Sequence, residues 1–242
     1  MEKALLIDIT KCVGCGECSA ACAAAHGFGA PTSELDGTNY TAVTQVGDLY
    51  ARHLCMNCKE PTCVSVCLVG AMTKHENGPV VYDFSKCIGC RYCIQACPFF
   101  IPKYEWDKTF PAVMKCNLCY EREGTACTDA CQFGATVYGD RDTLIAEAQR
   151  RVAENPGMYV DHIYGLKEVG GTSVLYISSK PFSELGFPTN VPDEAMPKLS
   201  WVVVSQIPKF AVATGVLLFG IHWITARRQE VLKAEALERE AK

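Results

Sequence analysis

The chain has 242 residues, a formal net charge of -4 and sixteen cysteines. The mild acidity, without a basic stripe that could follow a phosphate backbone, argues against nucleic acid as a partner. A disulfide scaffold is usually a short secreted chain, whereas this chain is long and its cysteines come in groups of four, so we expect metal chemistry instead.

The cysteines form four groups, and each group ends in C-x3-C. The first group reads CVGCGECSAAC and the third reads CIGCRYCIQAC, so both follow C-x2-C-x2-C-x3-C. The second and fourth groups have longer middle gaps of four and seven residues. In chain order the groups are Cys12, Cys15, Cys18 and Cys22; Cys55, Cys58, Cys63 and Cys67; Cys87, Cys90, Cys93 and Cys97; and Cys116, Cys119, Cys127 and Cys131.

The surroundings of the groups repeat as well. IDITKCVGC, from Ile7 to Cys15, matches YDFSKCIGC, from Tyr82 to Cys90. Each of the two stretched groups is followed by the same C-x2-G-A pattern. These matches indicate an internal duplication.

The compact spacing predicts how the ligands are shared. In C-x2-C-x2-C-x3-C, the first three thiolates bind one [4Fe-4S] cluster and the fourth binds another, because three cysteines on one tight loop cap three irons and the fourth points away. We therefore expect four [4Fe-4S] clusters. The residues alone do not choose the partners, but the neighbouring second and third groups favour a nested pairing. The expected quartets are Cys55, Cys58, Cys63 and Cys97; Cys67, Cys87, Cys90 and Cys93; Cys12, Cys15, Cys18 and Cys131; and Cys22, Cys116, Cys119 and Cys127.

Zinc is the alternative metal, and it would make the chain a zinc-stapled structural membrane adaptor. Zinc ribbons usually separate two C-x2-C pairs by a long spacer and have no use for further cysteines at x2 and x3, so we favour iron. Gly14, Gly16 and Gly89 would let backbone amides approach the sulfurs. Three lysines each precede a group cysteine and either raise cluster potentials or are solvated surface charges: Lys11, Lys86 and Lys115.

These motifs, together with GCRYCIQACPFFIPKY, KCNLC and GGTSVLYIS ahead of one hydrophobic helix, resemble the iron-sulfur beta subunit of membrane-bound formate dehydrogenase-N. They are equally similar to the anchored ferredoxin subunit of periplasmic uptake [NiFe] hydrogenases. The resemblance implies a non-catalytic electron-transfer subunit with the nested ligand pairing. Its implied partners are a catalytic large subunit, with a molybdopterin or NiFe centre, and a membrane cytochrome b or quinone-reducing subunit.

The fold expected from the duplication and the resemblance is α+β, with two pseudo-symmetric ferredoxin-like units in one four-cluster domain and one C-terminal transmembrane helix. The four-cluster domain spans residues 1–140, with unit one from 1–50 and 105–140 and unit two from 51–104. Residues 141–198 form a helix, a strand and an extended arm. Residues 199–226 cross the membrane, and 227–242 form a charged cytoplasmic tail.

The segment after the last cysteine changes character. Asp142 is a plausible N-cap for a helix that Asn155, Pro156 and Gly157 end. The β-branched and aromatic residues from Thr172 to Ser178 predict a strand. Three prolines between Phe187 and Pro197 predict an extended arm that leads to the membrane.

The hydrophobic segment Phe210 to Ala226 has 17 residues without a charge. Extended back through Pro208 to Trp201, it forms a helix in which Trp201 and Trp223 lie roughly 33 Å apart, as interfacial anchors do. Ala211 and Gly215 could seat a partner helix, or could simply face lipid. His222 either contacts a quinone or haem or faces the headgroups near the helix end.

The charges around this helix predict its orientation. Basic residues follow it in excess, so the tail should be cytoplasmic and the cluster domain periplasmic. Residues 1–12 show neither an apolar h-region nor a twin-arginine signal, so we expect the folded subunit to cross the inner membrane with a signal-bearing partner. This favours a formate dehydrogenase with molybdenum or tungsten over a hydrogenase.

Overall fold

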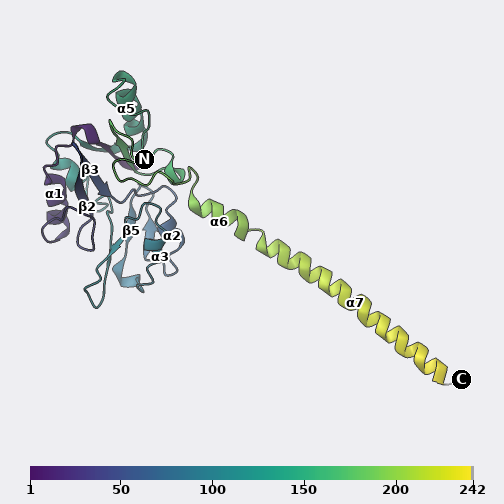
Figure 1. The fold of residues 1–242 in the computed structure, drawn as a ribbon. Coiled ribbons are helices and arrows are strands. Elements are labelled where there is room, and N and C mark those ends of the chain that lie inside the picture. The colour runs from purple at the N-terminus through teal and green to yellow at the C-terminus, as the bar shows by residue number, and fades with distance from the viewer. Residues whose placement is uncertain (241–242) are drawn as a thin grey trace. The chain divides into compact units, whose positions relative to one another are not determined.

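The computed structural model describes residues 1–240 and divides into two compact units, Met1–Pro197 and Lys198–Lys242. The first unit holds all sixteen cysteines and the described strands (Figure 1). This mixture of helices and strands agrees with the expected α+β class. Its longer elements are β1 (Lys3–Asp8), α1 (Glu17–His26), β2 (Thr41–Val46), β3 (Leu49–Leu54), β8 (Thr136–Asp140), α5 (Arg141–Glu154) and β9 (Val174–Ile177).

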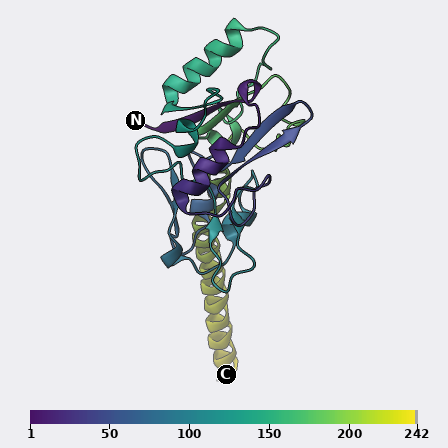
Figure 2. The same cartoon turned by 90° about the vertical axis from the view of Figure 1, so that its left-hand side faces the viewer.

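A three-stranded sheet in the order β8-β1-β9 lies at the centre of this unit. β1 runs antiparallel to β8 and parallel to β9, with Leu6 opposite Val137 on one side and Leu175 on the other. Its sequence KALLID is apolar at consecutive positions because neighbouring elements cover both of its faces. Leu144 and Ala148 of α5 pack against this sheet, and Figure 2 shows α5 lying across it.

The helix α5 begins earlier than predicted. Asp140 is its N-cap residue, so the prediction of Asp142 as N-cap is wrong, and Asp142 lies in the first turn. The chain passes directly from β8 into the helix, and Arg141 at this junction is buried, with its Nε donating to the Thr172 carbonyl oxygen at 2.8 Å. The helix ends at Glu154, before Asn155, as predicted.

Short elements surround the cysteine groups. The hairpin pairs are β2 with β3, β4 (Met72–Lys74) with β5 (Val80–Tyr82), and β6 (Lys103–Tyr104) with β7 (Val113–Met114). The one-turn helices are α2 (Thr62–Ser65), α3 (Tyr92–Gln95) and α4 (Ala126–Asp129). The 3-10 helices are η1 (Ile9–Lys11), η2 (Phe84–Lys86) and η3 (Glu168–Gly170).

The repeated sequence D-x-[S/T]-K-C adopts the same local structure twice. β1 leads into η1 and then Cys12, and β5 leads into η2 and then Cys87. In both copies the aspartate caps the turn: Asp8 accepts from the Thr10 amide at 3.1 Å, and Asp83 accepts from the Ser85 amide at 2.9 Å. Aspartate suits this position because its carboxylate reaches the backbone N–H two residues ahead.

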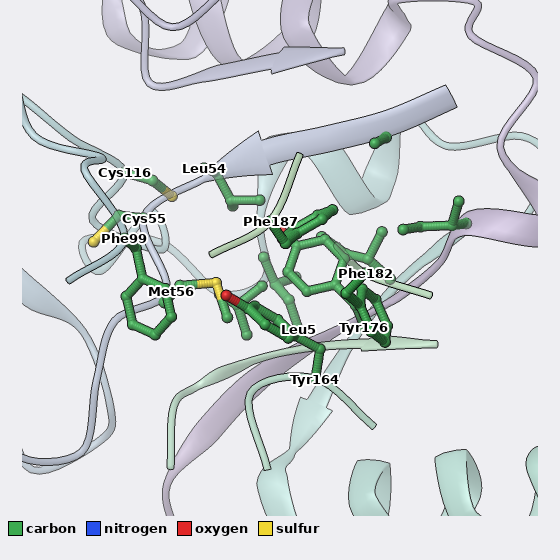
Figure 3. Packing of buried hydrophobic residues seen from close by; sticks show 14 of the residues in the cluster. Leu5, Leu54, Cys55, Met56, Phe99, Cys116, Tyr164, Tyr176, Phe182 and Phe187 are labelled. Carbon is green, nitrogen blue, oxygen red and sulfur yellow. The ribbon is translucent and has the colours of Figure 1, made fainter. Parts of the chain in front are cut away.

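A cluster of aromatic side chains joins the central sheet to the β2–β3 hairpin (Figure 3). The Phe187 ring centroid lies 4.8 Å from that of Tyr176 and 5.2 Å from that of Tyr164, and Phe182 packs 5.0 Å from Tyr164. Tyr176 belongs to β9, which confirms the predicted strand. The predicted arm has no helix or strand until Met196, but its first residue, Phe187, is anchored in this core.

The C-terminal helices are α6 (Met196–Val204) and α7 (Ile207–Glu240). Within the described chain, Met196–Leu237 is the stretch long and apolar enough to cross a membrane, with a mean hydropathy of 1.7 in its most apolar window. α7 continues beyond Ala226 into the charged region. Residues 241–242 of the predicted tail lie outside the described residues.

The prediction of one uninterrupted helix from Trp201 is wrong at Ser205 and Gln206, where α6 and α7 separate. Pro208 has no N–H to donate to the Val204 carbonyl, so the regular helical pattern cannot continue across this point. The Gln206 amide bonds instead to the Val203 carbonyl at 3.1 Å.

Candidate metal centres

All sixteen cysteines have free thiols. The structure brings them together in four groups of four. We call these groups sites A to D. They coincide with the four predicted quartets, although ligation itself stays a prediction. Site A is Cys12, Cys15, Cys18 and Cys131; site B is Cys22, Cys116, Cys119 and Cys127; site C is Cys55, Cys58, Cys63 and Cys97; and site D is Cys67, Cys87, Cys90 and Cys93.

Two kinds of contact define these groups. The four thiols of site A line one cavity, and the four thiols of site D line another. In site B, Cys116 has Cys22 and Cys127 as neighbouring thiols, and in site C, Cys58 has Cys55, Cys63 and Cys97 as neighbouring thiols. Each site therefore combines cysteines of two groups: the first and fourth groups share sites A and B, and the second and third groups share sites C and D.

The sites follow one another in the order A, B, C, D. Cys18 of site A and Cys22 of site B lie on the same helix, α1. Cys55 of site C lies beside Cys116 of site B, as Figure 3 shows. Cys63 of site C has Cys93 of site D among its electrostatic neighbours.

The exposure of the thiols differs along this order. Cys15 in site A and Cys90 in site D are exposed, whereas all four thiols of site B are buried, as is Cys55 of site C. The series of sites therefore reaches the surface of the unit at sites A and D. Site B is the most fully shielded from water.

Glycines shape the binding loops of sites A and D. Gly14 and Gly89 adopt left-handed backbone angles, with φ of +72° and +71°. A Cβ atom on Gly14 would lie 2.3 Å from the Tyr50 ring, and one on Gly89 would lie 2.9 Å from the Tyr104 hydroxyl. Only glycine fits both the backbone angle and the close approach. The two loops share the pattern K-C-[V/I]-G-C, and this requirement occurs in both.

Backbone amides also point at several sulfurs. The Ala71 amide donates to Cys67 Sγ at 3.2 Å, and the Gly89 amide donates to Cys87 Sγ at 3.4 Å. In site B, the Leu118 amide donates to Cys116 Sγ at 3.4 Å. Such N–H···S bonds stabilise thiolates and help to set the reduction potential of a bound cluster.

Burial has a large effect on the pKa of several thiols. It raises the pKa of Cys22 and of Cys63 to about 12, so these thiols stay protonated until a metal ion stabilises the thiolate. Cys127 behaves differently. Burial opposes its ionisation, but the Arg52 guanidinium and the Thr125 hydroxyl outweigh burial, so the pKa of Cys127 is lowered.

The donor set fits iron-sulfur clusters. Each site supplies the four thiolates that a [4Fe-4S] cluster takes. A zinc ion needs its four ligands around one point, with sulfurs at about 2.3 Å. Among residues 1–240, no group of three or more Cys, His, Asp or Glu side chains is arranged to hold a single metal ion. Thiols that surround a cavity, as in sites A and D, suit a four-iron cluster better than one zinc ion.

Comparison with known proteins agrees with this chemistry. The family model described as a 4Fe-4S dicluster domain matches residues 46–141. A protein of Nitratidesulfovibrio vulgaris is 34% identical over 257 residues, covering 97% of this chain and 70% of that protein. Hydrogenase-2 operon protein HybA of Escherichia coli O157:H7 is 34% identical over 239 residues, covering 76% of this chain and 72% of its own length.

The nitrate-inducible formate dehydrogenase iron-sulfur subunit of Escherichia coli K12 is 33% identical over 201 residues, covering 73% of this chain and 68% of that subunit. The chain belongs to this family of iron-sulfur subunits. As a member of the formate dehydrogenase and hydrogenase iron-sulfur family, it is an electron-transfer subunit of such complexes. The resemblance stated from the cysteine motifs is therefore confirmed.

Sequence reasoning missed two side chains that lie between these candidate sites. Arg52 lies buried against sites A and B, and Asn57 joins sites B and C by donating to the carbonyl oxygens of Cys55 at 3.0 Å and Cys116 at 3.3 Å. Neither residue belongs to a cysteine motif. Of the three lysines considered, Lys115 is buried, whereas Lys11 and Lys86 are exposed.

Proposed function

We propose that sites A to D each hold one [4Fe-4S] cluster, bound by the quartets of thiolates named above. The observation that carries the proposal is the meeting of all sixteen cysteines in four groups of four within a chain of this family. When bound, each cluster accepts and releases one electron. The chain itself would supply thiolates, direct amides at the sulfurs and keep water from site B.

We further propose that the two halves of the cluster domain are duplicated ferredoxin-like units. Sites A and B would form unit one, from residues 1–50 and 105–140, and sites C and D would form unit two, from residues 51–104. The matching turns after β1 and β5 support this, as do the glycine–tyrosine pairs at Gly14 and Gly89. Residues 141–198 would then brace unit one through α5 and β9.

We propose a molybdenum or tungsten formate dehydrogenase as the catalytic partner, with electrons passing through the subunit to a membrane cytochrome b or quinone-reducing subunit. A [NiFe] hydrogenase is the second candidate, because the relatives include HybA at 34% identity beside a formate dehydrogenase subunit at 33%. Sites A and D reach the surface of the unit, and they would face these two partners. No residue is assigned a catalytic role.

The helix α7 would anchor this subunit in the inner membrane. Its apolar length supports a single crossing, and Arg227 and Arg228 at the end of the apolar segment favour a cytoplasmic C-terminus. The cluster domain would then lie on the periplasmic side. Accessibility of a cysteine-free tag at the C-terminus to protease, in spheroplasts and in inverted vesicles, tests this orientation.

Metal analysis of the detergent-solubilised complex tests the whole proposal. Four clusters require about sixteen iron atoms per chain, beyond those of the partners. Molybdenum or tungsten without nickel would support the formate dehydrogenase partner, and nickel without either would assign the hydrogenase instead. Zinc in place of iron in the chain would refute the cluster proposal.

A further inference from the structure

One buried arginine lies where sites A and B meet. Arg52 sits on β3 and is 2% exposed. Its Nε donates to the Thr41 hydroxyl at 2.9 Å, and one terminal nitrogen donates to the Thr136 hydroxyl at 3.2 Å. Both hydroxyls are neutral, so they orient the guanidinium without balancing its charge.

The groups that can balance this charge are cysteine sulfurs. Within residues 1–240, Arg52 forms no ion pair with a carboxylate. It lines the site A cavity together with Cys18, and its strongest electrostatic partner is Cys127 of site B. A buried charge without a counter-charge is costly, so Arg52 requires negative groups at these two sites.

The position of Arg52 is fixed from several directions. Thr41 comes from β2 and Thr136 from β8, and the Tyr176 hydroxyl of β9 donates to the Arg52 carbonyl at 3.0 Å. Three separate elements therefore hold one side chain and its backbone. A charge held in this way is already in place when the charge of its neighbours changes.

We propose that Arg52 is the shared counter-charge of sites A and B and raises the reduction potential of the clusters at both. This rests on the proposed function, since it requires clusters at those sites. Reduction adds one electron, and hence one negative charge, to a cluster bound by four thiolates. A fixed positive charge beside the sulfurs favours the reduced form, and the low polarity of the buried setting strengthens the effect.

A redox titration of the four clusters, followed by electron paramagnetic resonance, tests this inference on the purified complex. Replacing Arg52 with Gln should lower the midpoint potential of two clusters and leave that of site D unchanged. We expect at least a tenfold fall in the equilibrium constant for reduction at sites A and B, which is about 59 mV for a one-electron couple. Arg52→Lys, which keeps the charge, should restore most of the shift.

Arg122→Gln is the matched control. Arg122 also acts on a site B thiol, Cys119, but its side chain is 44% exposed and already pairs with Asp129 at 2.7 Å. Its loss should leave all four midpoints unchanged, because solvent and Asp129 screen its charge.

The outcomes separate the inference from the proposed function. Iron well below sixteen atoms in the unmodified chain would refute the cluster assignment itself. Full iron in Arg52→Gln with unchanged midpoints would overturn the role of Arg52. If Arg52→Gln does not load its clusters, Arg52→Lys decides: loading with normal midpoints supports the charge, and failure to load shows that the shape of the guanidinium matters instead.

Discussion

The loop at Gly14 offers a sharp test of how the cluster-binding turns are built. Alanine at this position must adopt a left-handed φ of +72°, which costs about 1–2 kcal/mol for a residue with a Cβ. The new Cβ would also lie 2.3 Å from the Tyr50 ring. Displacing the ring or the loop adds roughly 1–3 kcal/mol, as overpacking does elsewhere. We therefore expect Gly14→Ala to destabilise the subunit by about 2–5 kcal/mol.

Gly134 provides the matched control in the same site. Its φ is +61°, and a Cβ there would meet nothing within 4 Å. Gly134→Ala should therefore lose only the stability that the left-handed backbone angle takes from a residue with a Cβ, about 1–2 kcal/mol. The assay is the temperature at which the visible absorbance of the bound clusters is lost, at one heating rate for all variants. Each kcal/mol corresponds to about 2–4 °C in a domain of this size.

A double variant completes the test. Tyr50→Ala removes the ring that the new Cβ would meet. The double variant Gly14→Ala, Tyr50→Ala should therefore lose less stability than the two single variants lose in sum. The reasoning is wrong if Gly14→Ala is no more harmful than Gly134→Ala, or if the two changes at Gly14 and Tyr50 are simply additive.

Three further predictions follow from residues of the same unit. Asp8→Asn should lower the free energy of unfolding by about 2–4 kcal/mol, because the buried carboxylate pairs with Arg151 at 3.3 Å and accepts a hydrogen bond from Tyr159 at 2.9 Å. Asp83→Asn, in the more exposed copy of the turn, should lower the melting temperature less than Asp8→Asn does. Equal melting temperatures for the two variants would contradict this. Lys115→Gln should lower the midpoint potential of the cluster at site C, since Lys115 is buried beside Cys63. Lys86→Gln should leave every midpoint potential unchanged, because Lys86 is exposed and pairs with Asp83. A redox titration of Lys115→Gln without any shift would refute the role of Lys115. In the reduced, iron-free chain, the pKa of a thiol is near 9.0 when unfolded, whereas the pKa of folded Cys22 and of folded Cys63 is about 12. The folded chain therefore loses stability as the pH rises from 9 toward 12. Equal melting temperatures at about pH 8 and pH 10 would contradict this.

The type of metal site could be predicted from the cysteine spacing, because the ligands of a [4Fe-4S] cluster recur at short, fixed intervals along the chain. Three thiols on one tight loop and a fourth beyond it are visible in the sequence at Cys12 and at Cys87. Glycine at Gly14 was expected for amide access, but its close approach to Tyr50 depends on a hairpin that the sequence does not place.

Arg52 could not be predicted, because its partners Cys18 and Cys127 come from distant segments that only the folded chain brings together. The three lysines show the same limit. Each precedes a group cysteine in the sequence, yet burial distinguishes Lys115 from Lys11 and Lys86. The helix break near Pro208 was missed for another reason: proline suits a first turn, and the sequence does not say whether a helix precedes that turn.

The nested grouping of the cysteines also fixes the order in which the sites can be completed during protein synthesis. With the proposed ligands, sites C and D have all their cysteines once the growing chain has passed Cys97, because both lie within residues 55–97. Cys12 waits for Cys131, and Cys22 waits for Cys116, Cys119 and Cys127. Under the proposed ligation, an iron-delivery system that acts on the emerging chain would therefore meet complete sets of cysteines at sites C and D first, and site A would be the last that it could fill.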